Sequence, residues 1–308
     1  MILSVSRRTD IPCYYSSWFL NRIKTGYADF RNPVNHRQLY RVPLTPDIVD
    51  CIVFWTKDPA PMLEKLPFLD NAGYRYYFQF TVTPYGHEIE RNLRDKDAII
   101  DTFKALSKQI GAQRVLWRYD PVLIHENFTV NDHKKAFLRL CEHLCEYTRQ
   151  VTVSFVDLYP KLKSPLVQAL NPEQTAELAE FIGCCAKEHG LKAYACCEEG
   201  DFGRFGIAPA SCIDSRLIEE ICGVSMALKP DNNQRKGCGC CESVDIGAYN
   251  TCKNGCTYCY ANYSASLVNA NFAAHDLESS LLTGRLEHGE IPVIKQSASN
   301  RSGQLSLF

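Results

Sequence analysis

The chain has 308 residues, 45% hydrophobic and 22% charged, a balance that excludes a disordered chain, a collagen-like repeat and a disulfide miniprotein. Lys and Arg total 34 against 35 Asp and Glu, so the charge provides no general attraction to nucleic acid or to an anionic membrane. No apolar run approaches the ~18 residues of a membrane span, and Arg7 and Arg8 come too early for a signal peptide, so we expect a cytoplasmic protein without a membrane partner.

Short β-rich runs alternate with helical patterns over most of the chain. The runs typical of parallel strands covered on both faces are Ile2–Val5, Cys51–Trp55, Tyr74–Val82, Arg114–Trp117, Val151–Val156, Leu191–Ala195 and Val244–Tyr249. Helices are predicted at Asp95–Ile110, after a cap at Asn131, from Asn171–Pro172 onward and around Asp214–Cys222. This alternation predicts an α/β fold, a complete or partial parallel (β/α) barrel of the TIM type.

The chain contains 16 cysteines, which in a reduced cytosol indicate metal binding or redox chemistry rather than disulfides. We assign residues 1–195 to the barrel strands and helices. Residues 196–242 are rich in cysteine, and we expect a cysteine-rich insertion with its own metal site. Residues 243–285 contain a strand and a cysteine loop, and residues 286–308 form a polar tail to which the sequence assigns no role.

Cys252, Cys256 and Cys259 form a C-x3-C-x2-C motif directly after the predicted strand Val244–Tyr249. Three thiolates on one loop can hold three irons of a 4Fe–4S cluster and leave the fourth iron open to an external ligand. Structural zinc usually takes four protein ligands, so a zinc loop, which remains the alternative, would need a fourth ligand from elsewhere.

With the aromatic Tyr258 before its third cysteine, this motif resembles the signature of the radical S-adenosylmethionine (SAM) superfamily. The string Cys256–Asn262 is similar to the spore photoproduct lyase and DNA repair photolyase branch. The whole chain resembles a bacterial family of unknown function that carries the motif near its C-terminus. The resemblance implies that the cluster, reduced by an external donor such as flavodoxin or ferredoxin, cleaves SAM to a 5′-deoxyadenosyl radical that abstracts hydrogen from a substrate. Tyr258 would then lie near the adenine.

The motif normally follows the first barrel strand near the N-terminus, whereas here it begins at residue 252. A circular permutation would account for this position, because chain termini that lie close together tolerate it. Val244–Tyr249 would then be the topological first strand and Ile2–Val5 the second, with residues 263–285 supplying the first helix.

Active sites of such barrels gather at the carboxyl ends of parallel strands. Resemblance to photoproduct lyases implies that Lys57 pairs with the SAM carboxylate, and that Arg118 and Asp120 match an Arg-x-Asp-Pro run of the same branch. The other candidate cofactor-binding side chains at or near strand ends are Gln79, Thr81 and Ser6, and the further charged ones are Arg7, Arg8, Asp10, Asp58 and Asp157. An ordinary ion pair on the rim remains the alternative for each charged residue.

Resemblance to the unknown-function family also implies a second, auxiliary 4Fe–4S cluster. Its ligands would be Cys196, Cys212, Cys238 and Cys240, with Cys197 and Cys241 as substitutes. A zinc site or spare cysteines remain alternatives. The helical cysteines Cys141, Cys145, Cys184, Cys185 and Cys222 are expected to be small buried hydrophobes, and the eight histidines show no ligand spacing.

The sequence therefore favours a radical SAM enzyme that binds two 4Fe–4S clusters and SAM. The substrate is left open between a small molecule, a peptide and a damaged nucleic acid. The alternative is a non-catalytic zinc or iron–sulfur protein, either a scaffold or an electron carrier.

Overall fold

The computed structural model describes residues 1–158, 162, 164–235 and 237–301. It is built on an eight-stranded sheet in which all neighbouring strands are parallel. Their spatial order is β10 (Val244–Asp245), β1 (Ile2–Val5), β4 (Cys51–Thr56), β5 (Tyr76–Thr81), β6 (Val115–Val122), β7 (Gln150–Phe155), β8 (Lys192–Ala195) and β9 (Ile207–Pro209). The predicted α/β class and parallel sheet are confirmed. Within the described residues the edge strands β10 and β9 do not pair with each other, so barrel closure is not shown.

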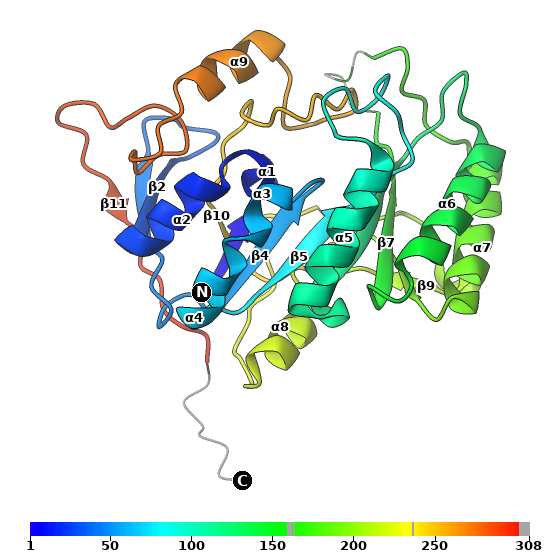
Figure 1. Cartoon of the computed structure of the whole chain (residues 1–308), viewed down its shortest axis with the longest axis horizontal. Coiled ribbons are helices and arrows are strands. Elements are labelled where there is room, and N and C mark those ends of the chain that lie inside the picture. Colours follow the sequence, from blue (N-terminus) through cyan, green and yellow to red (C-terminus); the bar gives the residue numbers. More distant parts are fainter. Residues whose placement is uncertain (159–161, 163, 236, 302–308) are drawn as a thin grey trace.

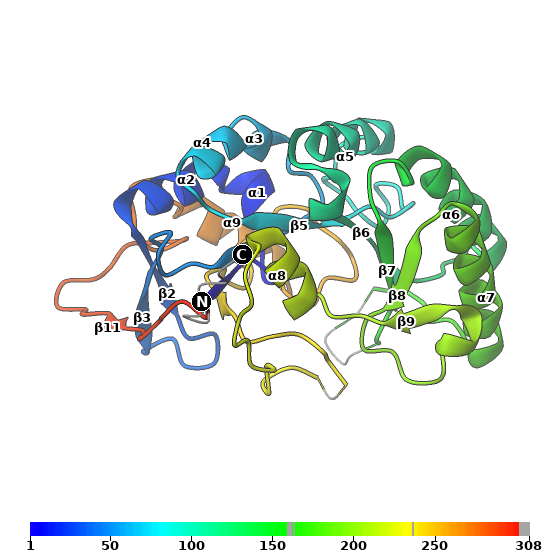
Figure 2. The ribbon, with the colours of Figure 1, turned by 90° about the horizontal axis from the view of Figure 1, so that it is seen from below.

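Helices cover the convex side of the curved sheet. They are α1 (Ile11–Tyr14), α2 (Ser16–Thr25), α3 (Ala60–Leu63), α4 (Leu66–Asn71), α5 (Lys96–Ile110), α6 (Val130–Leu144) and α7 (Pro172–Glu188). Figure 2 shows these helices around the outside of the arc, with α8 (Ser215–Cys222) on the open, concave side. The remaining helical elements are η1 (Ala112–Arg114), η2 (Gly203–Phe205) and α9 (Ala265–Ala273). Within the described ranges, no helix is long and apolar enough to cross a membrane.

Strand β10 lies beside β1, as predicted from the late position of the cysteine motif. The register places Leu3 opposite Val244 and Ser4 opposite Asp245. The strand is shorter than the predicted Val244–Tyr249, because the chain turns away after Asp245. Gly247 permits this turn close to β1, since a Cβ at Gly247 would come 2.0 Å from the hydroxyl oxygen of Ser6. Strand β10, which comes last in the chain among the strands of the large sheet, therefore lies at the edge of the sheet next to β1, which comes first.

A second, three-stranded sheet was not predicted. Strands β2 (Tyr27–Arg31) and β3 (Leu39–Pro43) are antiparallel, and β11 (Val293–Ile294) adds to β3 in parallel. Figure 1 shows β11, in red, beside these early strands. Part of the predicted tail 286–308 is thus integrated into the fold, while residues 302–308 lie outside the described ones.

The predicted helices are present, with two exceptions in their bounds. Asp95, Asn171 and Asp214 each accept a backbone N–H at the start of α5, α7 and α8. Helix α6 begins at Val130 rather than after Asn131, because Thr129 caps it in a reciprocal box with Asp132. The predicted helix over residues 263–285 is only α9, which ends at Ala273.

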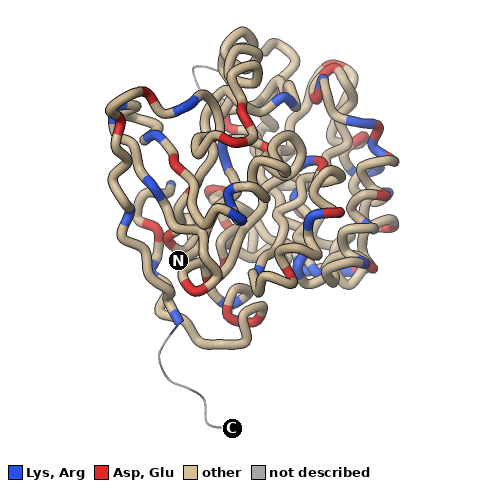
Figure 3. The backbone as a smooth tube through the Cα atoms, turned by 60° about the vertical axis from the view of Figure 1, so that its left-hand side comes forward, with Lys and Arg blue, Asp and Glu red and all other residues tan. Residues whose placement is uncertain are grey.

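The two faces of the sheet bury different segments. On β4, Ile52 and Phe54 join the large core under the outer helices. Cys51 and Val53 point the other way, into a smaller cluster that includes Cys212, Cys240 and Ile218 of α8. The cysteine-rich segment therefore packs inside the curve of the sheet. Acidic and basic residues are interspersed along the outer elements in Figure 3, in keeping with the net charge of −1.

Candidate functional site

The loop between β10 and α9 carries the three motif cysteines at the carboxyl end of the sheet (Figure 1). Hydrogen bonds within it close the loop. The N–H of Asn250 donates to the carbonyl of Ala261 at 2.9 Å, and the Asn250 side chain accepts from the N–H of Tyr263 at 2.9 Å. Asn262 donates to the carbonyl of Cys252 at 2.6 Å. The polar residues around the cysteines thus fix the backbone from which the thiols project.

The loop is also tied to the segment that follows β5. Cys256 and Glu90 form an antiparallel bridge, and the N–H of Thr257 donates to the carbonyl of Ile89 at 2.9 Å. Gly255 has a φ of +67°, and a Cβ there would come 2.9 Å from the side chain of Asn92. A glycine is required at this position by both the backbone conformation and the space.

Burial raises the pKa of all three motif thiols. Burial is the largest cause of the raised pKa of Cys252, and the negative charges of Asp10, Cys259 and Cys256 raise that pKa further. Burial raises the pKa of Cys256 to about 12, although Lys57 opposes the shift. The three sulfurs therefore lie close enough to influence one another, and they keep their protons at neutral pH unless a cation replaces them.

Glu90 is a buried carboxylate at the centre of the site. It accepts hydrogen bonds from Lys57 and Thr83, both at 2.7 Å, and from Lys96 and the Tyr258 hydroxyl. Burial would raise the pKa of Glu90, but the two lysines outweigh it and lower that pKa to about 2. The Lys57 ammonium also lies 5.5 Å from the centre of the Tyr258 ring. The structure thus brings the predicted Lys57 and Tyr258 together through a residue that sequence reasoning missed.

Asp10 joins the ends of β1 and β4 to the cysteine loop. Its carboxylate accepts from the hydroxyl of Thr56 at 2.7 Å, from the N–H of Lys57 at 2.8 Å and from the side chain of Asn254 at 3.1 Å. Burial raises the pKa of Asp10 to about 6 despite these hydrogen bonds. Asp10, predicted only as one of several strand-end charges, therefore positions Lys57 against the motif.

The proposed auxiliary cysteines fall into two adjacent sets. The sulfurs of Cys196 and Cys212 are 3.4 Å apart, and a hydrogen bond with Cys212 lowers the pKa of Cys240. Cys238 is half-buried and hydrogen-bonds Cys197. The structure therefore brings together three of the four predicted ligands, Cys196, Cys212 and Cys240. The fourth, Cys238, lies beside Cys197, which was named as a substitute.

Arg118 contacts this cysteine group directly. Its guanidinium donates to the sulfur of Cys212 at 2.9 Å and pairs with Asp120. Burial disfavours the charged arginine, but Cys212 and Asp120 outweigh it and raise the pKa of Arg118. Both residues lie within β6 rather than after its end, which corrects the prediction. The strand continues to Val122 through a shift of register relative to β7 between Tyr119 and Val122.

The other predicted cofactor-binding residues have structural contacts. Gln79 is buried and donates to the carbonyl of Cys212 at 2.7 Å. Thr81 is half-buried and lies in register with Arg118. The hydroxyl of Ser6 donates to Asp245 at 2.6 Å, which joins β1 to β10.

Several buried polar atoms around these two cysteine groups have no hydrogen-bond partner among the described residues. They include the indole N–H of Trp55, the side-chain oxygen of Gln79 and one guanidinium nitrogen of Arg7. The guanidinium groups of Arg7 and Arg118 lie 5.1 and 5.4 Å from the Trp55 ring centre. Because buried polar groups nearly always have a hydrogen-bond partner, these atoms indicate where a bound ligand or water is expected to provide one.

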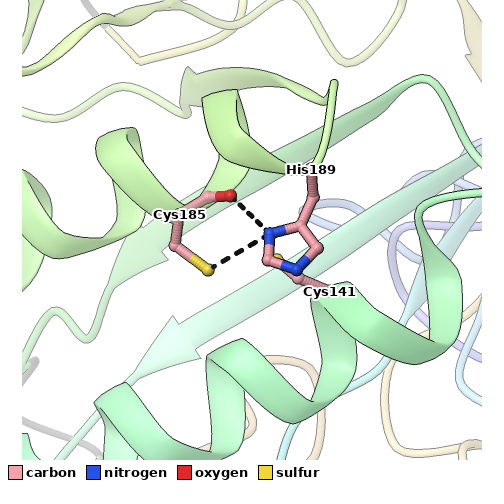
Figure 4. Close-up of side chains that lie close together, drawn as sticks. All are labelled: Cys141, Cys185 and His189. Carbon is pink, nitrogen blue, oxygen red and sulfur yellow. Dashed lines mark hydrogen bonds between the residues drawn. The ribbon is translucent and has the colours of Figure 1, made fainter.

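A third group of possible ligands was missed. Cys141, Cys185 and His189 place one ligand atom each within 4.8 Å of one another (Figure 4). Cys141 and Cys185 are buried in helices as predicted, but Cys184 is exposed. The statement that no histidine shows ligand spacing was wrong, because the pattern Cys185-x3-His189 puts both side chains on one face of a helix turn.

Comparisons with known proteins place the chain in a family. The family described as "Domain of unknown function (DUF1848)" matches residues 2–261, and the chain belongs to it. No curated protein matches. A solved structure provisionally described as an alpha-L-fucosidase from Bacteroides thetaiotaomicron VPI-5482 is similar at 12% identity and a TM-score of 0.26, over 72% of this chain and 82% of the other.

Proposed function

We propose that this DUF1848 protein is a radical SAM enzyme with two iron–sulfur clusters. The observation that carries the proposal is the convergence of the C-x3-C-x2-C loop, Lys57 and Tyr258 around Glu90 at the carboxyl ends of the strands. Cys252, Cys256 and Cys259 would hold the SAM-binding cluster. When bound and reduced, that cluster would supply reductive cleavage of SAM to a 5′-deoxyadenosyl radical.

The chain's own residues would bind and orient SAM. Lys57 would pair with the SAM carboxylate. Burial lowers the pKa of Lys57, but Glu90 and other negative groups outweigh it and raise that pKa, so Lys57 keeps its positive charge until SAM binds. Lys96 also pairs with Glu90, so the carboxylate keeps a partner when Lys57 turns to SAM. Tyr258 would pack near the adenine from the same loop.

The second cluster would be held by Cys196, Cys212 and Cys240 with either Cys238 or Cys197. Thiolates alone form this donor set, which suits iron–sulfur clusters or zinc. Arg118 contacts Cys212, and the charges of Cys240 and Cys212 outweigh burial in raising the pKa of Arg7. These two cations would balance the negative charge of the cluster. The unpartnered atoms of Trp55 and Gln79 leave hydrogen-bonding capacity for a substrate between the two cysteine groups.

The test is anaerobic purification of the full chain with reductant and SAM. The wild-type protein should be brown and should release 5′-deoxyadenosine, whereas the variant with Cys252, Cys256 and Cys259 changed to Ala should lose about four irons and keep about four, the content of one cluster. The exposed Cys184→Ala is the matched control and should retain full iron and activity.

Deoxyadenosine release that survives the triple change would contradict the assignment. A colourless protein without iron, whose zinc content falls in the triple variant, would favour the non-catalytic zinc scaffold. The substrate would be identified as the compound that accelerates deoxyadenosine release. The candidates to test are small molecules, peptides and damaged nucleic acid. Reduction would require an external donor such as flavodoxin or ferredoxin.

A further inference from the structure

We infer that Cys141, Cys185 and His189 form a mononuclear zinc site that links the ends of α6 and α7. Cys141 lies in the last turn of α6, Cys185 lies in the last turn of α7, and His189 is the C-cap residue directly after α7. Both helices belong to the outer layer of the fold (Figure 2), whereas the two iron–sulfur cysteine groups lie at the carboxyl end and inside the curve of the sheet. The inference does not depend on the proposed radical chemistry.

The spacing of the ligand atoms fits a tetrahedral ion. With zinc–sulfur distances of about 2.3 Å and zinc–nitrogen distances of about 2.0 Å, tetrahedral geometry separates two ligand atoms by about 3.5–3.8 Å. One ring nitrogen of His189 and the sulfurs of Cys141 and Cys185 all lie within 4.8 Å of one another, at most about 1 Å beyond that separation. Small side-chain rotations would therefore complete the site without moving either helix.

The imidazole is held in place beside the thiols. Nδ1 of His189 lies 2.8 Å from the carbonyl oxygen of Cys185, and Figure 4 shows the ring beside the Cys185 side chain, with Cys141 partly hidden behind it. When Nδ1 donates to this carbonyl, the other ring nitrogen, Nε2, keeps its lone pair for a metal, which is the usual arrangement of a metal-binding histidine. One ring nitrogen and two sulfurs would thus face a common point.

The chemistry of the donor set favours zinc. Two thiolates and one imidazole suit Zn²⁺, and the three ligands include no carboxylate that would favour magnesium or calcium. Cys141 and Cys185 are 0% and 3% exposed, while His189 is half-buried, so a water molecule can reach the fourth position from its side. The exposed Glu142 and Glu188 add negative charge near the thiols.

Binding would exchange protons for metal without any redox step. Zn²⁺ would displace the two thiol protons into solvent and accept electron pairs from both sulfurs and one imidazole nitrogen. Because these ligands come from two helices, the ion would bind the folded chain and would stabilise the pairing of α6 with α7.

The test compares metal content in three full-length variants purified in parallel. His189→Gln and Cys185→Ser should each lose about one zinc per chain, the occupancy of a mononuclear site, with unchanged iron. Cys184→Ser is the matched control, because it removes an exposed cysteine of the same helix. In a chelator competition, zinc affinity should fall more than about 100-fold in His189→Gln, beyond the loss typical of outer-shell residues.

Equal zinc in His189→Gln and Cys184→Ser, including none in both, would overturn the inference. Loss of iron instead of zinc would overturn it as well. His189→Gln keeps the test valid if Cys185→Ser fails to fold, since His189 is only half-buried. The triple variant of Cys252, Cys256 and Cys259 should retain this zinc, so failure of the radical proposal and failure of the zinc site give different results.

Discussion

The charge of Glu90 provides a direct test of the architecture around the cysteine loop. The Glu90→Gln substitution keeps the size of the side chain but removes its negative charge. Lys57 and Lys96 then lose the buried carboxylate with which both form ion pairs. The pKa of Glu90 is lowered from 4.5 to about 2, and at 1.36 kcal/mol per unit this shift corresponds to about 3 kcal/mol. Breaking a buried ion pair by removing one partner costs about 3–5 kcal/mol, so both arguments predict a loss of about 3 kcal/mol.

Urea unfolding at pH 7 and at lower pH would measure this loss. Because the folded-state pKa of Glu90 is lowered, its contribution to stability is fully present above the unfolded-state value of 4.5 and is lost as the pH falls through about 2. The wild-type free energy of unfolding should therefore fall more steeply between these pH values than that of Glu90→Gln.

Glu88→Gln is the matched control for this experiment. Glu88 lies two positions away, its side chain is 49% exposed, and its oxygen is 3.9 Å from the His125 ring. Its replacement should change the free energy of unfolding by less than about 0.5 kcal/mol. If Glu90→Gln and Glu88→Gln are equally stable, or if both show the wild-type pH dependence, Glu90 does not hold the two lysines as described.

Two further substitutions test other parts of the fold. Gly183→Ala should lower the free energy of unfolding by about 1–3 kcal/mol in a thermal or urea denaturation, because its Cβ would lie 1.8 Å from the carbonyl oxygen of Phe205. Glu180→Ala, on the exposed side of the same helix, is its control, and an equally stable Gly183→Ala would refute the close contact. Asp50→Asn should cost about 1–3 kcal/mol and speed proteolysis of the chain after β11, because the buried carboxylate binds the N-terminal ammonium and that segment. Cleavage no faster than in the exposed Asp47→Asn would argue against this anchoring role.

The sequence predicted the parallel strands because most of them are continuous apolar runs. The second sheet escaped prediction because its strands are half polar. Asp29 of β2 and Arg41 of β3 lie opposite each other and form a two-hydrogen-bond ion pair at 2.8 and 2.9 Å. A charged residue in the middle of a strand departs from the apolar pattern by which strands are predicted. Its place in the strand is explained only by the oppositely charged residue on the neighbouring strand. Strands β9 and β11 have three and two residues, too few for any periodicity.

The candidate site could be predicted only where one short segment carries the signal. The spacing of Cys252, Cys256 and Cys259 is local, so the motif was visible in the sequence. Glu90 was not, because its partners Lys57 and Tyr258 are 33 and 168 positions away and meet it only in the folded chain. The same limit applies to the ligand group at His189, although its i, i+4 spacing from Cys185 was a usable signal.

The position of β10 also determines how the candidate site is held together. The chain connects the other adjacent strands of the large sheet in sequence, but β10 and β1 lie near opposite ends of the chain. Their junction therefore depends on side-chain contacts, and Asp245 accepts hydrogen bonds from the hydroxyls of Ser4 and Ser6 and from the N–H of Arg7. Asp10 and Glu90 add contacts from the segments that follow β1 and β5 to the cysteine loop. A cysteine motif near the C-terminus is thus positioned by residues from the first third of the chain, which explains why the motif alone could not reveal the geometry of its site.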